Sequence, residues 1–228
     1  VREYREQGYL PEALLNYLVR LGWSHGDKEI FSLDEMIRFF DIAAVNQSAS
    51  AFSPEKLRWV NQQHIIAADP AILGPALAPH LQAIGLDPAN GPDPADVASG
   101  FHERAETLIE MAESCRYCYE DFNEIDPAAK KKHLRPAVLD AMKTARANLD
   151  AVTDWDTGPI SDAIQSAADS HEINFGKLGQ PVRVAVTGGP ESPPIDVVLF
   201  LVGRERTLRR LDRGIEIIEE RAAASGQD

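Results

Sequence analysis

Two cysteines stand three residues apart, at Cys115 and Cys118, and the chain contains no others. This C-x-x-C spacing is that of half a zinc site, and His102 and His133 are available as imidazole ligands. A structural zinc site needs four ligands, usually with a second pair at short spacing, which the sequence lacks. We therefore predict structural cysteines and no metal site. Two cysteines without a disulfide framework also fit a reducing, cytoplasmic compartment.

Basic side chains gather in two places. One cluster is Lys130-Lys131-Lys132-His133-Leu134-Arg135, and the other comprises Arg204, Arg206, Arg209, Arg210 and Arg213. Each cluster is either a solvated helix face, with arginines paired to nearby acids such as Glu205 and Asp212, or a contact for a phosphate backbone. The candidates for phosphate contact are Lys130, Lys131, Lys132, Arg135, Arg209 and Arg210.

The elements that must position these residues are helical. Pro11-Glu12 opens a helix that ends at Gly22, and we expect Leu14, Leu15, Leu18 and Leu21 to point inward. Ser32-Leu33-Asp34-Glu35 forms a capping box, followed by Leu33, Met36, Ile37 and Phe40 on one face. Ser53-Pro54-Glu55 begins the next helix.

Farther along, prolines and apolar stripes define the remaining elements. Residues 69–79 predict short helices broken at their prolines, and residues 85–94 predict a loop. A longer helix is expected from Glu103 toward Tyr119. Apolar stripes predict two more helices, one through Val138, Met142, Ala145 and Leu149 and one through Leu208, Leu211, Ile215 and Ile218. Residues 182–186 alternate like a strand, but one such run cannot form a sheet.

The 228 residues carry a net charge of −13, with 44% hydrophobic residues and a mean hydropathy of −0.26. No apolar run approaches the roughly 20 residues that span a bilayer, so we expect no membrane partner. Non-specific nucleic-acid binders are usually basic, so we expect no DNA partner, and any RNA contact must come from local basic patches. The chain begins at Val1 without a Met, and we expect it to be part of a longer protein.

Three separated segments resemble bacterial glutamyl-tRNA synthetases, in family order. They are Tyr4–Ser24, the run Phe52-Ser53-Pro54-Glu55-Lys56-Leu57-Arg58-Trp59-Val60-Asn61, and Lys177-Leu178-Gly179-Gln180-Pro181-Val182-Arg183 with Gly203-Arg204-Glu205-Arg206. The resemblance covers nearly the whole chain and begins after the KMSKS loop of these class I enzymes. It implies an all-α fold of consecutive small helical bundles, in which residues 182–186 are helical. The expected parts are a stem-contact region (1–67) and two anticodon-binding bundles (68–116 and 117–228).

The resemblance also implies that the catalytic elements lie outside this chain. The His-Ile-Gly-His type element and the KMSKS lysines, which act on ATP phosphates, are both missing from the sequence. Ser24-His25-Gly26-Asp27 follows a predicted helix and lacks a second histidine, so it predicts a loop. We expect no catalytic or cofactor-binding residue here, with ATP and Mg²⁺ bound by the absent catalytic domain of the parent glutamate–tRNA ligase.

By resemblance, Arg104 reads an anticodon base at the edge of the triplet, and Arg183, Ser192, Pro193 and Ile195 read the others. Ser192 and Ile195 depart from the family pattern. Two simpler interpretations remain open: Arg104 pairs with Glu103 or Glu106, and Pro193-Pro194 only forms a turn. Further candidates, on a segment expected at the inner corner of tRNA, are Lys56, Arg58 and Asn61.

The resemblance therefore implies recognition of tRNA-Glu, by a chain that we expect to be monomeric. An arginine at position 104 is the state expected of an enzyme that charges tRNA-Glu and rejects tRNA-Gln. The alternative is an acidic helical appendage that binds protein and has no anticodon-dependent RNA affinity.

Overall fold

The computed structural model describes residues 2–46 and 51–225, and within them every regular element is a helix. An isolated bridge between His25 and Lys28 is the one β-type pairing among those residues. The all-α prediction is confirmed. The chain divides into two compact units, Val1–Pro88 with Asp93–Cys115, and Ala89–Pro92 with Arg116–Asp228. The expected three-part division, with a boundary near residue 67, stays a prediction.

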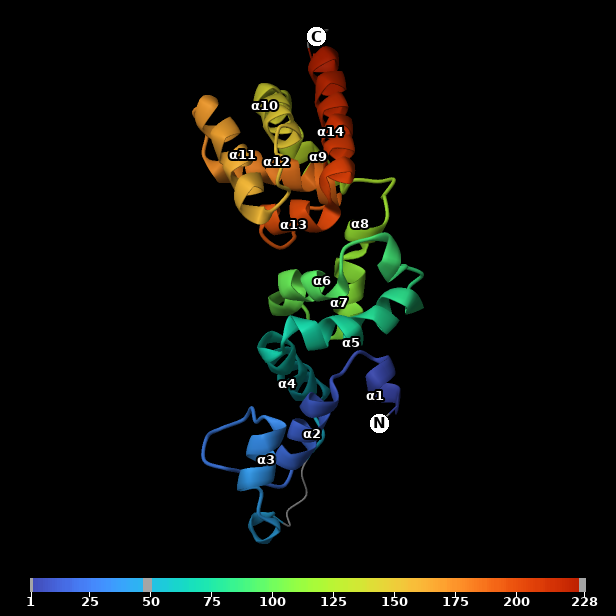
Figure 1. Ribbon diagram of the computed structural model, residues 1–228, viewed down its shortest axis with the longest axis vertical. Coiled ribbons are helices and arrows are strands. Elements are labelled where there is room, and N and C mark those ends of the chain that lie inside the picture. The colour runs from blue at the N-terminus through green and yellow to red at the C-terminus, as the bar shows by residue number, and fades with distance from the viewer. Residues whose placement is uncertain (1, 47–50, 226–228) are drawn as a thin grey trace. The chain divides into compact units, whose positions relative to one another are not determined.

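The first unit holds the N-terminal helices (Figure 1). Its elements are α1 (Arg2–Glu6), α2 (Pro11–Arg20), α3 (Leu33–Phe39), η1 (Ile42–Ala44), α4 (Pro54–Ala67), α5 (Pro70–Ala83), α6 (Pro94–Phe101), η3 (His102–Arg104) and α7 (Leu108–Ser114).

Helix starts in this unit follow local cap chemistry. The Ser32 hydroxyl accepts the Glu35 N–H while the Glu35 carboxylate accepts the Ser32 N–H, which is the predicted capping box. Ser53 caps α4 by accepting the Lys56 N–H at 3.2 Å. Asp69 caps α5 in the same manner. These side chains satisfy first-turn N–H groups that have no partner within the helix.

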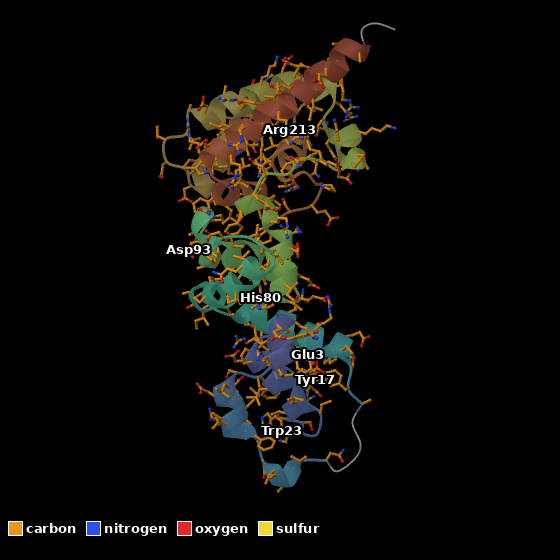
Figure 2. All side chains as sticks on the ribbon, turned by 90° about the vertical axis from the view of Figure 1, so that its right-hand side faces the viewer. Glu3, Tyr17, Trp23, His80, Asp93 and Arg213 are labelled. Carbon is orange, nitrogen blue, oxygen red and sulfur yellow. The ribbon has the colours of Figure 1, made fainter. Side chains whose placement is uncertain are left out.

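The inward faces of α2 and α3 differ from the prediction. Leu15 and Leu18 are 41% and 49% exposed, whereas Asn16 and Tyr17 of α2 are buried. Figure 2 shows Tyr17 on this helix. In the seven-residue α3 only Met36 is buried, and it packs in a cluster with Trp23 and Phe31. The buried face of α2 is therefore rotated from the predicted stripe and includes Asn16, which donates to the Glu29 carbonyl and accepts the Phe31 N–H.

The proline-rich segment forms one continuous helix, which corrects the expectation of broken short helices. Pro75 and Pro79 lie inside α5 on its exposed side. Leu73, Leu77 and Leu81 are fully buried on the other side. Each proline removes one hydrogen bond at the solvent face, and burial of the leucine stripe offsets that loss.

The second unit contains the C-terminal helices and the last two residues of the short helix η2 (Pro88–Asn90). Its other elements are α8 (Arg116–Tyr119), α9 (Pro127–His133), η4 (Pro136–Val138), α10 (Leu139–Asp150), α11 (Thr157–Ser170), α12 (Phe175–Thr187), α13 (Ile195–Val202) and α14 (Arg204–Ser225). The strand-like run at 182–186 lies in α12 and is helical, as the resemblance implied. The helix expected from Glu103 to Tyr119 is instead three short elements, η3, α7 and α8.

Candidate nucleic-acid interface

Three residues that the resemblance selects meet at one guanidinium group in the second unit. Arg183 on α12 donates from Nε to Ser192 Oγ at 2.7 Å and from Nη2 to the Pro193 carbonyl at 3.4 Å. Ser192 Oγ in turn donates to the Pro193 carbonyl at 2.9 Å. Ile195 begins α13 directly after this loop and is 3% exposed. Arg183 thus fixes the loop between α12 and α13.

Gln180, one turn before Arg183, completes this network and was missed by sequence reasoning. Its Oε1 accepts from Arg183 Nη1 at 2.7 Å, and its Nε2 donates to the Pro190 carbonyl at 2.8 Å. Spacing of three residues on a helix was the available signal, because it places Gln180 beside Arg183. Gly188 supports the turn that follows, since its φ of 78° lies in the left-handed region.

Arg104 lies in the first unit on η3, and its side chain is exposed. Within residues 2–46 and 51–225 it makes no hydrogen bond or ion pair with another side chain. Among the described residues Arg104 pairs with neither Glu103 nor Glu106, and Glu106 accepts from Arg58 Nε at 2.6 Å instead. An exposed, unpaired arginine retains its full donor fork for an external ligand.

Lys56 and Arg58 of α4 are candidates for phosphate contact. Both side chains are paired with glutamates that lie outside α4. Lys56 Nζ bonds to Glu29 and lies 3.8 Å from the centroid of the Trp59 ring. Arg58 bridges Glu106 and Glu110. The hydrogen bond that Arg58 donates to Glu106, with the charge of Glu110, raises the pKa of Arg58 above its ordinary value. Contact with phosphate would require these ion pairs to be exchanged.

Asn61 is fully buried and has a structural role. Its Oδ1 accepts the Leu10 N–H at 2.8 Å, and its Nδ2 donates to the carbonyls of Glu106 at 2.6 Å and Gly8 at 3.4 Å. One amide therefore joins three segments of the first unit. In this structure Asn61 offers no surface to a ligand, and we withdraw it as a phosphate contact.

The arginines of α14 largely bind protein carbonyls. Arg206 donates to Cys118 and Tyr119, and Arg213, labelled in Figure 2, donates to Phe122 and Asn123. Arg221 binds Lys130, Lys131 and Leu134 in the same way. These donors lie along one side of the helix and bind the segment 118–134, which includes the end of α8 and all of α9, to it. The predicted second basic cluster thus holds the fold together.

Arg210 is the most enclosed of these arginines, at 5% exposure. It donates to the carbonyls of Tyr117, Val186 and Glu120, and to the Asp121 carboxylate. Burial lowers the pKa of Arg210, and its bonds to Asp121 oppose that shift. For Asp121, burial acts to raise the pKa, but hydrogen bonds from Arg210 and Arg209 outweigh it and the pKa is lowered. Arg210 is therefore withdrawn as a phosphate contact.

The remaining basic candidates differ in their partners. Arg209 is half-exposed and binds Asp121 Oδ2 at 2.6 Å. Lys130, Lys131, Lys132 and Arg135 are all exposed, and in the part of the chain that the structure describes their side chains make no hydrogen bond or ion pair.

The two cysteines are structural in the part of the chain that the structure describes. Cys115 and Cys118 are buried, and Cys115 Sγ donates to the Ala112 carbonyl at 3.3 Å. The described residues contain no group of three His, Cys, Asp or Glu side chains placed to hold a metal.

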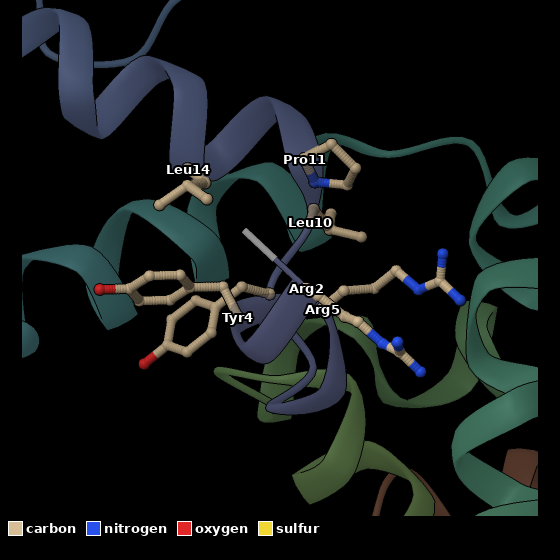
Figure 3. A pocket seen from close by; sticks show the side chains of 7 residues that line it. Arg2, Tyr4, Arg5, Leu10, Pro11 and Leu14 are labelled. Atoms are coloured by element: carbon tan, nitrogen blue, oxygen red, sulfur yellow. The ribbon is translucent and has the colours of Figure 1, made fainter.

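Figure 3 shows a pocket of about 390 Å³ in the first unit, lined by Arg2, Tyr4 and Arg5 among others. Arg2 is paired with Glu6 there. Among the same described residues, no helix is long and apolar enough to cross a membrane.

Comparison with known proteins supports the resemblance. Residues 73–215 match the family described as "Anticodon binding domain", and residues 1–59 match "tRNA synthetases class I (E and Q), catalytic domain". Glutamate–tRNA ligase 1 of Alkalilimnicola ehrlichii is 50% identical over 223 residues, which is 98% of this chain and 47% of that protein. The chain thus spans about half the length of this curated relative.

Solved structures show the same likeness. A glutamate tRNA ligase from Elizabethkingia meningosepticum, in complex with its amino acid, superposes with a TM-score of 0.81 at 28% identity, over 93% of this chain and 42% of that one. The glutamate-tRNA synthetase of Elizabethkingia anophelis gives a TM-score of 0.78 at 28% identity, with the same coverage. The chain therefore belongs to the anticodon-binding domain family, and it is a homologue of the class I glutamate–tRNA ligases.

Proposed function

We propose that this chain recognises tRNA-Glu, through its anticodon, as part of a glutamate–tRNA ligase. The observation that carries the proposal is the meeting of Arg183, Ser192 and Pro193 at one guanidinium, because the resemblance selects all three as anticodon-reading residues. The family match over residues 73–215 supports the same site.

Sequence-specific RNA recognition acts on unpaired bases whose edges and faces are exposed. A guanidinium suits this task, since it presents several donors in one plane and stacks on a base. Arg183 is held on three sides by Gln180, Ser192 and Pro193, so little conformational entropy is lost when it binds. Arg104 supplies a second fork in the other unit, and Ile195 is buried at the start of α13. The contribution of Arg104 is tested with its own variant below.

We further propose that glutamate activation, with ATP and Mg²⁺, is carried out by residues of the parent ligase outside this chain. The chain alone is then a tRNA-binding part without ligase activity. The same proposal includes a monomeric, cytoplasmic protein whose nucleic-acid partner is tRNA and not DNA, and which has no membrane partner. The homology to glutamate–tRNA ligases supports tRNA as the partner.

The test is binding of the 228-residue chain to tRNA-Glu and to transcripts with single anticodon substitutions, at near-physiological salt. We expect affinity to fall when the anticodon is changed. The variant Arg104→Gln should relax the preference at one base by about 10-fold, which corresponds to about 1.4 kcal/mol. Arg5→Gln is the matched control, because it removes the charge of another exposed arginine in the same unit. It should leave the preference unchanged.

Equal, weak and salt-sensitive binding to every transcript would contradict anticodon recognition by this chain. That outcome would favour an acidic appendage that binds protein, which is the role that a net charge of −13 suggests.

A further inference from the structure

We propose that the exposed cations of α9 and its following turn form a docking site for an RNA phosphate backbone, separate from the base-reading residues. The site comprises Lys130, Lys131, Lys132 and Arg135, called here the α9 patch. This inference rests on the proposed function, because the RNA is taken to be the bound tRNA. The patch would contribute affinity that does not depend on base identity.

Pairing separates the α9 patch from most other cations of the second unit, with the isolated, exposed Lys177 as an exception. Lys143 binds Glu219 at 2.6 Å, Arg146 binds Asp150 and Asp212, and Arg204 binds Asp150. Their charges are neutralised locally. The four α9 side chains have no such partner among the described residues, so in an acidic chain they leave a local excess of positive charge.

The fold holds these cations on a fixed platform. Asp126 caps α9 by accepting the Ala129 N–H at 2.6 Å, and Ala129 and Leu134 are buried on the inner side. At the other end Arg221 donates to the carbonyls of Lys130 at 2.9 Å and Lys131 at 3.3 Å. Both ends of α9 are therefore anchored by hydrogen bonds, and its lysine side chains point to solvent.

The local field can be seen at His133, which lies between the cations. Burial lowers the pKa of His133, and the charges of Lys132 and Arg135 lower it further. No acidic residue is among the groups that influence its pKa. The imidazole is thus kept neutral beside the patch and adds no charge at neutral pH.

The chemistry of the patch fits phosphates and not base edges. Lysine is a flexible point charge that binds phosphate without geometric selection, whereas base reading uses planar forks and stacking faces. Three of the four groups are lysines. The patch therefore attracts the backbone of any RNA, and the Arg183 network is left to distinguish its sequence.

The test uses the whole chain with all four residues changed to glutamine, Lys130→Gln, Lys131→Gln, Lys132→Gln and Arg135→Gln. Glutamine has a helix propensity close to that of lysine, and all four side chains are exposed, so the fold should persist; a thermal melt checks this. Affinity for a tRNA-Glu transcript is measured against KCl concentration. The slope of log K on log [KCl] is negative, and its magnitude should decrease by about 3 if all four cations contact phosphates, since each contact contributes about 0.7 to 0.9.

Lys143→Gln is the matched control, because it removes a lysine of the same unit that is already paired with Glu219. Its slope should equal that of the unchanged chain. The preference for the Glu anticodon, as a ratio of affinities, should be the same in all three proteins.

An unchanged slope in the quadruple variant would overturn the inference, and so would an equal decrease in Lys143→Gln. A loss of anticodon preference together with the slope would also overturn it, because the patch would then not be separate from base reading. If the unchanged chain shows no anticodon preference, the proposed function fails, whereas the slope still decides whether the patch binds phosphate.

Discussion

Arg183 donates from Nε to Ser192 Oγ at 2.7 Å, and the two residues are nine positions apart in the sequence. Ser192 is buried at 8% exposure, and its hydroxyl donates a hydrogen bond to the Pro193 carbonyl. The guanidinium therefore has a defined orientation before any ligand binds. Reading of a base edge depends on such orientation, because a displaced donor loses most of its hydrogen-bond energy.

Gln180 should be a positioning residue for this guanidinium. Gln180→Met removes its bonds to Arg183 and to the Pro190 carbonyl, and we expect anticodon discrimination to fall by about 10-fold. Gln165→Met is the control, since Gln165 bonds only along its own helix to Asp169. Affinity ratios for cognate and substituted transcripts provide the measurement. A variant that melts earlier but keeps its discrimination would show a merely structural role.

Arg210 should matter for stability and not for RNA. Arg210→Met leaves three carbonyls and Asp121 without their donor, and we expect the free energy of unfolding to fall by about 3 kcal/mol or more. Arg209→Met should cost less than about 1 kcal/mol, because its pair with Asp121 is solvent-exposed. Urea denaturation of both variants compares them. Equal effects would contradict the buried role of Arg210.

Asn61 should behave similarly in the first unit. Asn61→Ala removes hydrogen bonds to Leu10, Gly8 and Glu106 within the core, and the expected loss is about 2 to 3 kcal/mol. The neighbouring, partly exposed Gln62 gives a control, Gln62→Ala, with an effect below about 1 kcal/mol. Reduced tRNA affinity with unchanged stability would instead restore Asn61 as an RNA contact.

The stability of the first unit should depend on His64 at mildly acidic pH. Burial lowers the pKa of His64, with an opposing effect of Glu12, and its Nε2 lies 3.0 Å from Asn16 Oδ1. The unfolded chain therefore binds a proton first as pH falls below about 6.5, so stability is complete above that pH and decreases below it. The slope should not exceed about 1.4 kcal/mol per pH unit, and partial exposure reduces it.

Urea denaturation between pH 7.5 and 5 measures this slope, and His64→Gln should reduce it by the share due to His64, while His80 and His133, whose pKa values burial also lowers, keep their shares. The carboxylates with lowered pKa, among them Glu35 and Asp150, lose their contribution only near pH 4 and below, outside this window. An identical slope in His64→Gln would show that another group is responsible.

The sequence alone determined the features that depend on neighbouring residues. The capping box at Ser32 and the cap at Ser53 formed as predicted, because a cap needs only residues three positions apart or fewer. The stripe through Leu208, Leu211, Ile215 and Ile218 is buried for the same reason of local periodicity. The resemblance also selected Arg183, Ser192 and Pro193, which the structure brings together.

Only the tertiary structure decided which cations are available to a ligand. Arg210 and Lys131 are both basic residues on helices, yet one is enclosed by four acceptors and the other faces solvent. The tertiary structure likewise decided that Leu15 and Leu18 are exposed while Asn16 of the same helix is buried. Burial and pairing are set by segments distant in sequence, such as the contacts of Arg210 with residues 117–121, and helical periodicity carries no information about them.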